Sequence, residues 1–148
     1  MSVLLDGRVA LITGAGSGIG RSHAVLMAER GADLIINDLN SEGLAETAEC
    51  AASSGGKVIQ FVHDVSDVAG MARKTQAAEV ELGKIDILVN NAGVSGERLA
   101  FEDVTEDAYD RMVDINLKGS FFLTQAVVPG MKKRRYGKII NTSSMYAL

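Results

Sequence analysis

The stretch ALITGAGSGIGRSHA, residues 10–24, places four glycines directly after an apolar run. Each glycine loses more backbone freedom on folding than other residues do, so such a cluster needs a physical reason. A flexible linker, a turn between two strands, and a loop that lets a phosphate approach the backbone would each provide one. The sequence on either side of the loop decides among these three.

Short apolar segments alternate with amphipathic segments along the whole chain. The apolar segments, which we expect to be strands, are residues 8–13, 33–38, 57–62, 85–90 and 138–143. The first of them is typical of a strand buried on both faces. The helices that the pattern predicts are 18–30, 42–53, 66–82 and 105–131. Strands that alternate with helices in this way are parallel, and right-handed crossovers put helices on both faces. The sequence therefore predicts one doubly wound, Rossmann-like α/β domain over residues 1–148.

Some details of the helices are expected from single residues. The spacing of Ile19, Leu26 and Met27 predicts the buried face of the first helix, and Ser41 is a suitable N-cap for the second. The apolar pattern of 105–131 continues through Gly119, so we expect the helix to continue there as well. At Pro129 we expect a kink or a helix end, because proline lacks the amide hydrogen.

The glycines follow the first predicted strand and open the first predicted helix. A helix N-terminus offers unpaired N–H groups and a partial positive charge, so a pyrophosphate fits there. The flanks are too regular for a linker, and the helix that follows rules out a hairpin. The common G-x-G-x-x-G spacing is not met, because Ile19 stands at its third glycine, and Arg21-Ser22 after Gly20 does not fit a P-loop.

The observed pattern, Thr13-Gly14-x-x-x-Gly18-x-Gly20, resembles the short-chain dehydrogenase/reductase family. Three further stretches carry the resemblance from about Gly7 to the end of the chain: NNAG (90–93), DINLKGSFF (114–122) with its Asn116, and INTSS (140–144) with its Ser144. Glycine-rich turns after a first strand also occur in methyltransferases. NNAG and Ser144 count against that alternative.

Asp38 ends the second strand, 24 residues after Gly14, near the roughly 20 expected for a ribose-binding acid. A carboxylate there accepts hydrogen bonds from both ribose hydroxyls and repels a 2′-phosphate, so it favours NAD over NADP. The neutral Ser17 agrees, since relatives that prefer NADP often carry a basic residue just before the middle glycine. An ordinary aspartate leading into a helix is the alternative. Arg21 is expected to be a solvated helix residue.

The resemblance implies further cofactor contacts: the Asp64-Val65 pair at adenine, and Asn91 to Gly93 beside the nicotinamide. For Asn91 a role in bracing the sheet is equally open. The complete set of candidate cofactor-binding residues is Gly14, Ser17, Gly18, Ile19, Gly20, Asp38, Leu39, Asp64, Val65, Asn91, Ala92 and Gly93.

In this family a serine binds the substrate oxygen, a tyrosine transfers the proton, a lysine lowers the pKa of the tyrosine, and an asparagine holds a water. Ser144 and Asn116 match the serine and the asparagine. None of Tyr109, Tyr136 and Tyr146 begins the family's Tyr-x-x-x-Lys motif. Two hypotheses follow. The chain is the N-terminal part, apparently truncated after the fifth strand, of an NAD-dependent oxidoreductase acting on a secondary alcohol or ketone such as a hydroxysteroid, 3-oxoacyl or sugar substrate. Alternatively, it is a truncated, non-catalytic dinucleotide-binding module.

Composition limits the partners and the compartment. A formal net charge of -4 argues against nucleic acid, and no apolar run is long enough to suggest a membrane partner. A single cysteine, Cys50, excludes an intrachain disulfide and argues against a structural metal. Together with the lack of a signal-peptide pattern, it predicts a cytoplasmic protein. The helix 105–131 carries an apolar stripe with Leu117, Phe121 and Val128, and the resemblance implies a homo-oligomer through this helix.

Overall fold

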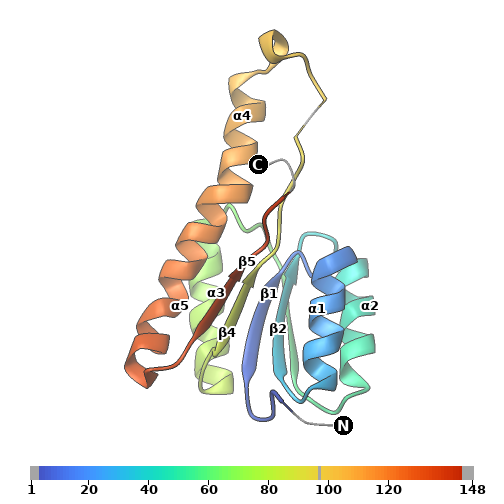
Figure 1. Cartoon of the computed structure of the whole chain (residues 1–148), viewed down its shortest axis with the longest axis vertical. Helices are drawn as coiled ribbons and strands as arrows, with labels where there is room; N and C mark the ends of the chain where they lie inside the picture. Colours follow the sequence, from blue (N-terminus) through green and yellow to red (C-terminus); the bar gives the residue numbers. More distant parts are fainter. Residues whose placement is uncertain (1–3, 97, 145–148) are drawn as a thin grey trace.

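The computed structural model describes residues 4–96 and 98–144. Its strands form one parallel sheet in the order β3-β2-β1-β4-β5 (Figure 1). The strands are β1 (Val9–Thr13), β2 (Asp33–Asp38), β3 (Val58–Val62), β4 (Ile87–Asn90) and β5 (Lys138–Asn141). The predicted α/β fold is confirmed, and the strand ends differ from the predicted ranges by two residues at most.

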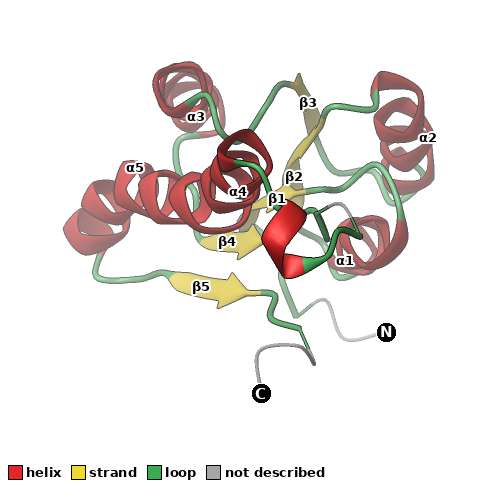
Figure 2. Cartoon of the chain, turned by 90° about the horizontal axis from the view of Figure 1, so that it is seen from above, coloured by secondary structure: helices red, strands yellow, loops and turns green. Residues whose placement is uncertain are grey.

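Helices cover both faces of the sheet, as Figure 2 shows from above. One face carries α1 (Gly18–Glu29) and α2 (Ser41–Ala52), and the opposite face carries α3 (Val68–Leu82) and α5 (Ser120–Arg134). Alternate strand residues belong to the two separate cores: Ile12 and Val89 pack on the side of α1 and α2, and Leu11 and Leu88 on the side of α3 and α5. β1, β2 and β4 are buried on both faces, which explains why they read as continuous apolar runs, whereas the edge strands β3 and β5 are more exposed.

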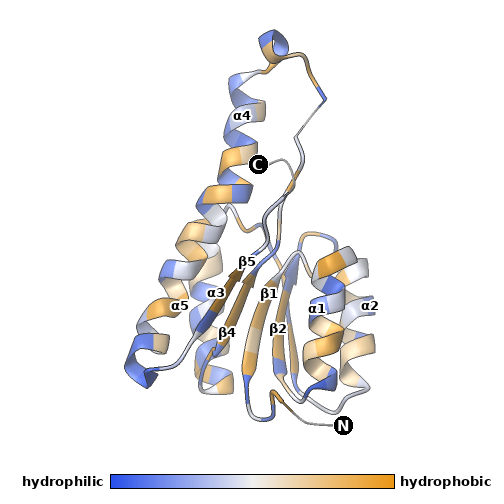
Figure 3. Cartoon of the chain, in the orientation of Figure 1, coloured by the Kyte–Doolittle hydropathy of each residue, from blue (hydrophilic) through white to orange (hydrophobic). Residues whose placement is uncertain are grey.

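β5 is the exposed edge of the sheet. Its residues are all exposed, including Ile139 at 38% and Ile140 at 42%. Figure 3 shows the hydrophobic colouring along the β5 ribbon. Unpaired backbone groups on an apolar edge favour pairing with other chains. We therefore expect aggregation of this fold to begin by pairing of other chains with this edge.

The segment predicted as one helix over 105–131 consists of α4 (Glu106–Val113), a π-helical turn η2 (Asp114–Gly119) and α5, after a short 3₁₀ turn η1 (Phe101–Asp103). Together they form a rod whose α4 end projects beyond the sheet (Figure 1). Gly119 lies inside the rod, as expected. A Cβ there would come within 2.9 Å of the Val65 carbonyl oxygen, so a glycine lets the rod approach the loop after β3.

The rod does not end at Pro129, because α5 continues to Arg134. Pro129 removes the donor to the carbonyl of Gln125, but both residues are exposed, so water can satisfy that carbonyl. Of the helices in the described ranges, none is long and apolar enough to cross a membrane.

The structure corrects two expectations about the helix ends. Asn40, not Ser41, caps α2, and its side chain accepts a hydrogen bond from the Gly43 amide at 3.1 Å. α3 begins at Val68, two residues later than predicted, with Asp67 as its N-cap. In both cases the capping oxygen lies three residues before the amide it accepts from, the usual capping geometry.

The predicted buried face of α1 is wrong for Ile19 and Leu26, whereas Met27 packs against the core as predicted. Ile19 is 61% exposed and Leu26 50% exposed, whereas Ala24 and Ala28 are buried. The fully buried residues of α1 are the small Gly20, Ala24 and Ala28.

Candidate functional site

The candidate residues gather at the carboxyl ends of the strands, around the loop that joins β1 to α1. β1 and β4 are neighbours at the point where the strand order reverses, which is where open α/β sheets bind ligands. The fold therefore places the glycine loop at the expected binding position.

The glycines give this loop its close contacts. Gly14 has a φ of 64°, and a Cβ on it would lie 2.9 Å from the Cα of Ala92. Gly18 also has a positive φ, 52°. A Cβ on Gly20 would collide with the carbonyl oxygen of Gly14. Glycine is therefore required at these positions for different reasons, and together they bring the loop against the end of β4.

The N-cap residue of α1 does not cap the helix with its side chain. Ser17 occupies the N-cap position but makes no side-chain capping bond. In contrast, Asn40, Asp67 and Thr105 cap α2, α3 and α4 with their side chains. The first N–H groups of α1 therefore remain available to an anion.

Asp38, the last residue of β2, lies against the glycine loop. Its Oδ2 accepts a hydrogen bond from the Gly16 amide at 2.8 Å, and its Oδ1 accepts from the Asn40 amide at 2.9 Å. The carboxylate thus stands beside the loop and also braces the entry to α2, the alternative that the sequence left open.

Arg21 is not a solvated helix residue, which corrects the expectation from the sequence. Its guanidinium donates to the carbonyl oxygens of Gly16 and Gly43, to the Thr47 hydroxyl at 3.0 Å, and to the Glu46 carboxylate at 2.8 Å. Thr47 is completely buried, and its hydroxyl lies within hydrogen-bond distance of the carbonyl oxygens of Ala15, at 2.8 Å, and Gly43, at 2.9 Å. These two side chains connect the glycine loop to α2.

The loop after β3 is held by its own polar residues. Oδ1 of Asp64 accepts hydrogen bonds from the amide and the hydroxyl of Ser66, at 2.8 and 2.7 Å. Val65 packs against the core under α3 and α5. The Gly70 amide, and after it His63 at 2.9 Å, hold the pKa of the Asp67 carboxyl below its ordinary value.

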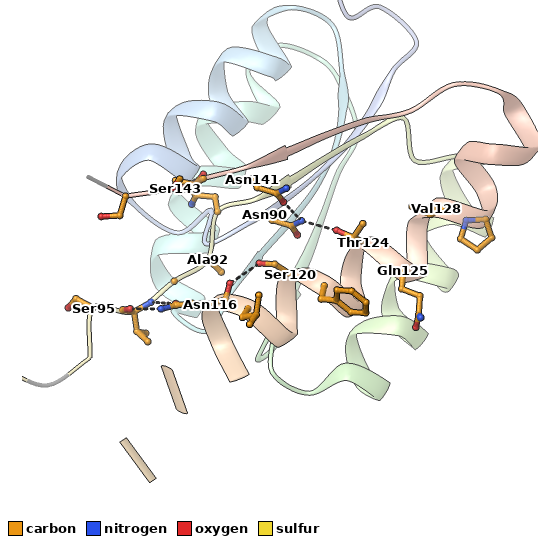
Figure 4. A pocket seen from close by; sticks show the side chains of 18 of the residues that line it. Asn90, Ala92, Ser95, Asn116, Ser120, Thr124, Gln125, Val128, Asn141 and Ser143 are labelled. Atoms are coloured by element: carbon orange, nitrogen blue, oxygen red, sulfur yellow. Dashed lines mark hydrogen bonds between the residues drawn. The ribbon is translucent and has the colours of Figure 1, made fainter. Parts of the chain in front are cut away.

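The NNAG segment after β4 braces its neighbours. Nδ2 of Asn90 donates to Oγ1 of Thr124 at 3.0 Å and to Oδ1 of Asn141 at 2.9 Å (Figure 4). Nδ2 of Asn91 donates to the Thr13 carbonyl at 3.1 Å, and its Oδ1 accepts from the Thr142 hydroxyl at 3.2 Å. Bracing is therefore a role that the Asn91 side chain fills, and its cofactor contact stays a prediction.

Asn116 lies in the π-helical turn and holds the loop that follows Gly93. Its Oδ1 accepts from the Val94 amide at 2.8 Å and its Nδ2 donates to the Val94 carbonyl at 2.9 Å. A Cβ on Gly93 would lie 3.1 Å from Oδ1 of Asn116, so this glycine permits the contact. The Asn116 carbonyl accepts a 3.4 Å bond from the Ser120 hydroxyl.

A cleft of about 1030 Å³ lies between α5 and the ends of β4 and β5 (Figure 4). It brings the two candidate catalytic residues, Asn116 and Ser144, together with the segment Asn91 to Gly93. Its lining also includes Lys132 and the exposed apolar side chains of Leu117 and Phe121. Tyr146 lies outside the described residues.

The remaining predicted residues lie at the other end of the site. The glycine loop, Asp38 and Asp64 do not line this cleft. Ile19 and Leu39 extend their apolar side chains into solvent beside the loop, 61% and 59% exposed. The predicted residues thus form two groups, one around the glycine loop and one around the cleft.

Sequence reasoning missed Arg21 and Thr47, which hold the glycine loop. One feature of the sequence could have pointed to Thr47: it is a polar residue four positions after Gly43, on the same face of α2 as the buried Ala48 and Ala51. No such feature pointed to Arg21, because an arginine on a helix is usually solvated.

The model of the short chain dehydrogenase family matches residues 8–148 of this chain. The chain is 40% identical over 144 residues to the 3-oxoacyl-[acyl-carrier-protein] reductase FabG of Thermotoga maritima, covering 97% of this chain and 58% of that protein.

Two solved structures are similar to the chain. A xylitol dehydrogenase bound to NAD+ has a TM-score of 0.92 at 34% identity, over 97% of this chain and 55% of that one. A metagenomic short-chain oxidoreductase in complex with NADP has a TM-score of 0.91 at 30% identity, over 95% of this chain and 64% of that one. The chain therefore spans little more than half the length of these relatives.

Proposed function

The chain belongs to the short-chain dehydrogenase/reductase family, and on this premise we propose that it binds NAD and forms the cofactor-binding part of an oxidoreductase for a secondary alcohol or ketone. When bound, the nicotinamide accepts or gives the hydride. Family membership removes the methyltransferase alternative. The observation that carries the proposal is the open N-terminus of α1, with the Asp38 carboxylate hydrogen-bonded to the same loop.

The residues present fit a dinucleotide. The glycine loop and the N–H groups of α1 would hold the pyrophosphate, and Asp38 would accept from the adenosine ribose. Asp64 and Val65 would contact adenine, and Ala92 and Gly93 would lie beside the nicotinamide ribose. Ile19 and Leu39 would cover the cofactor with their exposed side chains.

Substrate binding and proton transfer would take place in the cleft that Asn116 and Ser144 line. The Ser144 hydroxyl would hold the substrate oxygen, and Asn116 would hold a water for proton transfer. Since both groups of the Asn116 amide are bonded to Val94, that water has to bind the backbone carbonyl of Asn116. Of the cleft-lining residues described, Lys132 alone carries an acidic or basic side chain, so we expect the proton donor to be supplied by a residue outside this lining.

The non-catalytic dinucleotide-binding module remains a second candidate, favoured by the missing Tyr-x-x-x-Lys motif. Sequencing the gene beyond the codon for Leu148 separates the two. An in-frame Tyr-x-x-x-Lys supports the oxidoreductase, and a stop codon supports the module.

Cofactor choice tests the role of Asp38. We expect calorimetric titration to show NADH binding at least about tenfold more tightly than NADPH, because like charges in contact cost several kcal/mol. Asp38→Ala should reduce the difference in affinity between NADH and NADPH, since it removes the repulsive charge together with an acceptor for ribose. Asp38→Asn is the matched control, since it removes the charge and keeps one acceptor oxygen. Equal affinities in the unmodified chain would contradict the role of Asp38.

Self-association is expected through the rod formed by α4, η2 and α5. Leu117 is 65% and Phe121 61% exposed, and isolated apolar side chains of this size gain by burial against a second copy. Light scattering at micromolar concentration should show a homo-oligomer that Phe121→Asp dissociates. Val80→Asp, at a side chain on α3 that is 80% exposed, should leave it intact. A stable monomer of the unmodified chain would refute the prediction.

A further inference from the structure

Arg21 links three elements that meet at the phosphate-binding end of the fold. It stands on α1, which lies side by side with α2 in Figures 1 and 2. Nη2 donates to the Gly16 carbonyl in the loop and to the Gly43 carbonyl in α2 at 3.1 Å, while Nε donates to Oγ1 of Thr47 at 3.0 Å. α2 comes so close that a Cβ on Gly43 would lie 2.5 Å from the Gly16 carbonyl oxygen.

These bonds fix the direction of two consecutive peptide groups. In a trans peptide the C=O and the N–H point in opposite directions. Thr47 holds the Ala15 carbonyl at 2.8 Å, and the N–H of that peptide, on Gly16, accordingly points away to Oδ2 of Asp38. Arg21 holds the Gly16 carbonyl in the same manner, so the N–H of Ser17 is turned away from α2.

The bonds from Arg21 to the glycine loop and α2 depend on the planar shape of the guanidinium more than on its charge. The ion pair with Glu46 is partly solvated, since the two side chains are 33% and 57% exposed, and such pairs contribute little. Nη2 alone reaches the carbonyls of Gly16 and Gly43, and Nε reaches the Thr47 hydroxyl at the same time. An ammonium group has one nitrogen and cannot make both sets of bonds together.

We propose that Arg21 is a positioning residue for the dinucleotide pyrophosphate: it turns the Gly16 carbonyl toward α2 and thereby directs the Ser17 amide at the bound phosphates. The inference rests on the proposed NAD binding. The guanidinium of Arg21 is hydrogen-bonded to groups of the protein and is therefore not available to a 2′-phosphate. Prior orientation of a binding loop increases affinity by reducing the ordering cost of binding.

The test compares ligands with and without phosphate, by calorimetry for NADH and ADP and by NMR titration for adenosine. Arg21→Met should weaken NADH and ADP by about tenfold and leave adenosine within about twofold, because adenosine does not touch the loop amides. Arg21→Lys should weaken NADH and ADP as well. Arg30→Met, which makes the same charge change at the other end of α1, is the matched control and should leave all three unchanged.

Several results would overturn the proposal. If Arg21→Met binds ADP as tightly as the unmodified chain, the guanidinium does not position the loop. An equal loss for adenosine would give Arg21 a purely structural role, and full binding by Arg21→Lys would show that charge alone matters. If the unmodified chain does not bind NADH, the proposed function itself fails, which is a different result from any of these.

Discussion

A polypeptide limited to these 148 residues should oxidise a secondary alcohol with NAD at no more than the background rate. A serine hydroxyl such as that of Ser144 stays protonated near neutral pH and is a poor base. General acid–base catalysis is typically worth about 10²–10⁴-fold, so its absence removes most of the rate. Extension through a segment that carries Tyr-x-x-x-Lys should restore NAD-linked activity, measured as NADH absorbance.

Solubility should change together with activity. The extension is also expected to cover the exposed edge at β5, where Ile139 and Ile140 stand unprotected, so the longer polypeptide should aggregate less. Ser144→Ala in the longer polypeptide is the control, and it should lose the restored activity. An enzymatic rate from the 148 residues alone, abolished by Ser144→Ala, would show that the proposed source of the proton is wrong.

The second large effect is expected at Gly20. A Cβ on this residue would collide with the Gly14 carbonyl oxygen and lie 2.7 Å from Nδ2 of Asn91. Both neighbours are fixed, the first as backbone and the second through its bond to Thr13. Gly20→Ala should therefore lower the free energy of unfolding by about 3 kcal/mol, measured by urea denaturation, and weaken NADH by about a hundredfold as the loop is displaced.

Gly55→Ala is the matched control for Gly20→Ala. Gly55 has a φ of 84° but no atom within 4 Å of an added Cβ, so alanine adds backbone strain without a collision. It should cost about 1 kcal/mol and leave NADH binding unchanged. If Gly20→Ala is no more destabilising than Gly55→Ala, then the contact with Gly14 is not what requires a glycine at position 20.

The fold could be predicted because its signals are local. The strands buried on both faces read as apolar runs, and Gly31, Gly55 and Gly83 follow the helices closely, as helix ends require. The face of α1 could not be predicted in this way. Periodicity favours the large apolar Ile19 and Leu26, but the way in which α1 packs on the sheet buries Ala24 and Ala28 instead.

The sequence by itself determined the doubly wound topology, the place of the glycine loop and the family, because these follow from the period of the apolar residues and from short motifs in a fixed order. Only the tertiary structure decided what Arg21, Asn91 and Asn116 contact. Their partners are Gly16 and Gly43, Thr13 and Thr142, and Val94. A polar side chain can pair with any backbone group brought within its reach, so its partner is set by how the elements pack and leaves no pattern in the sequence.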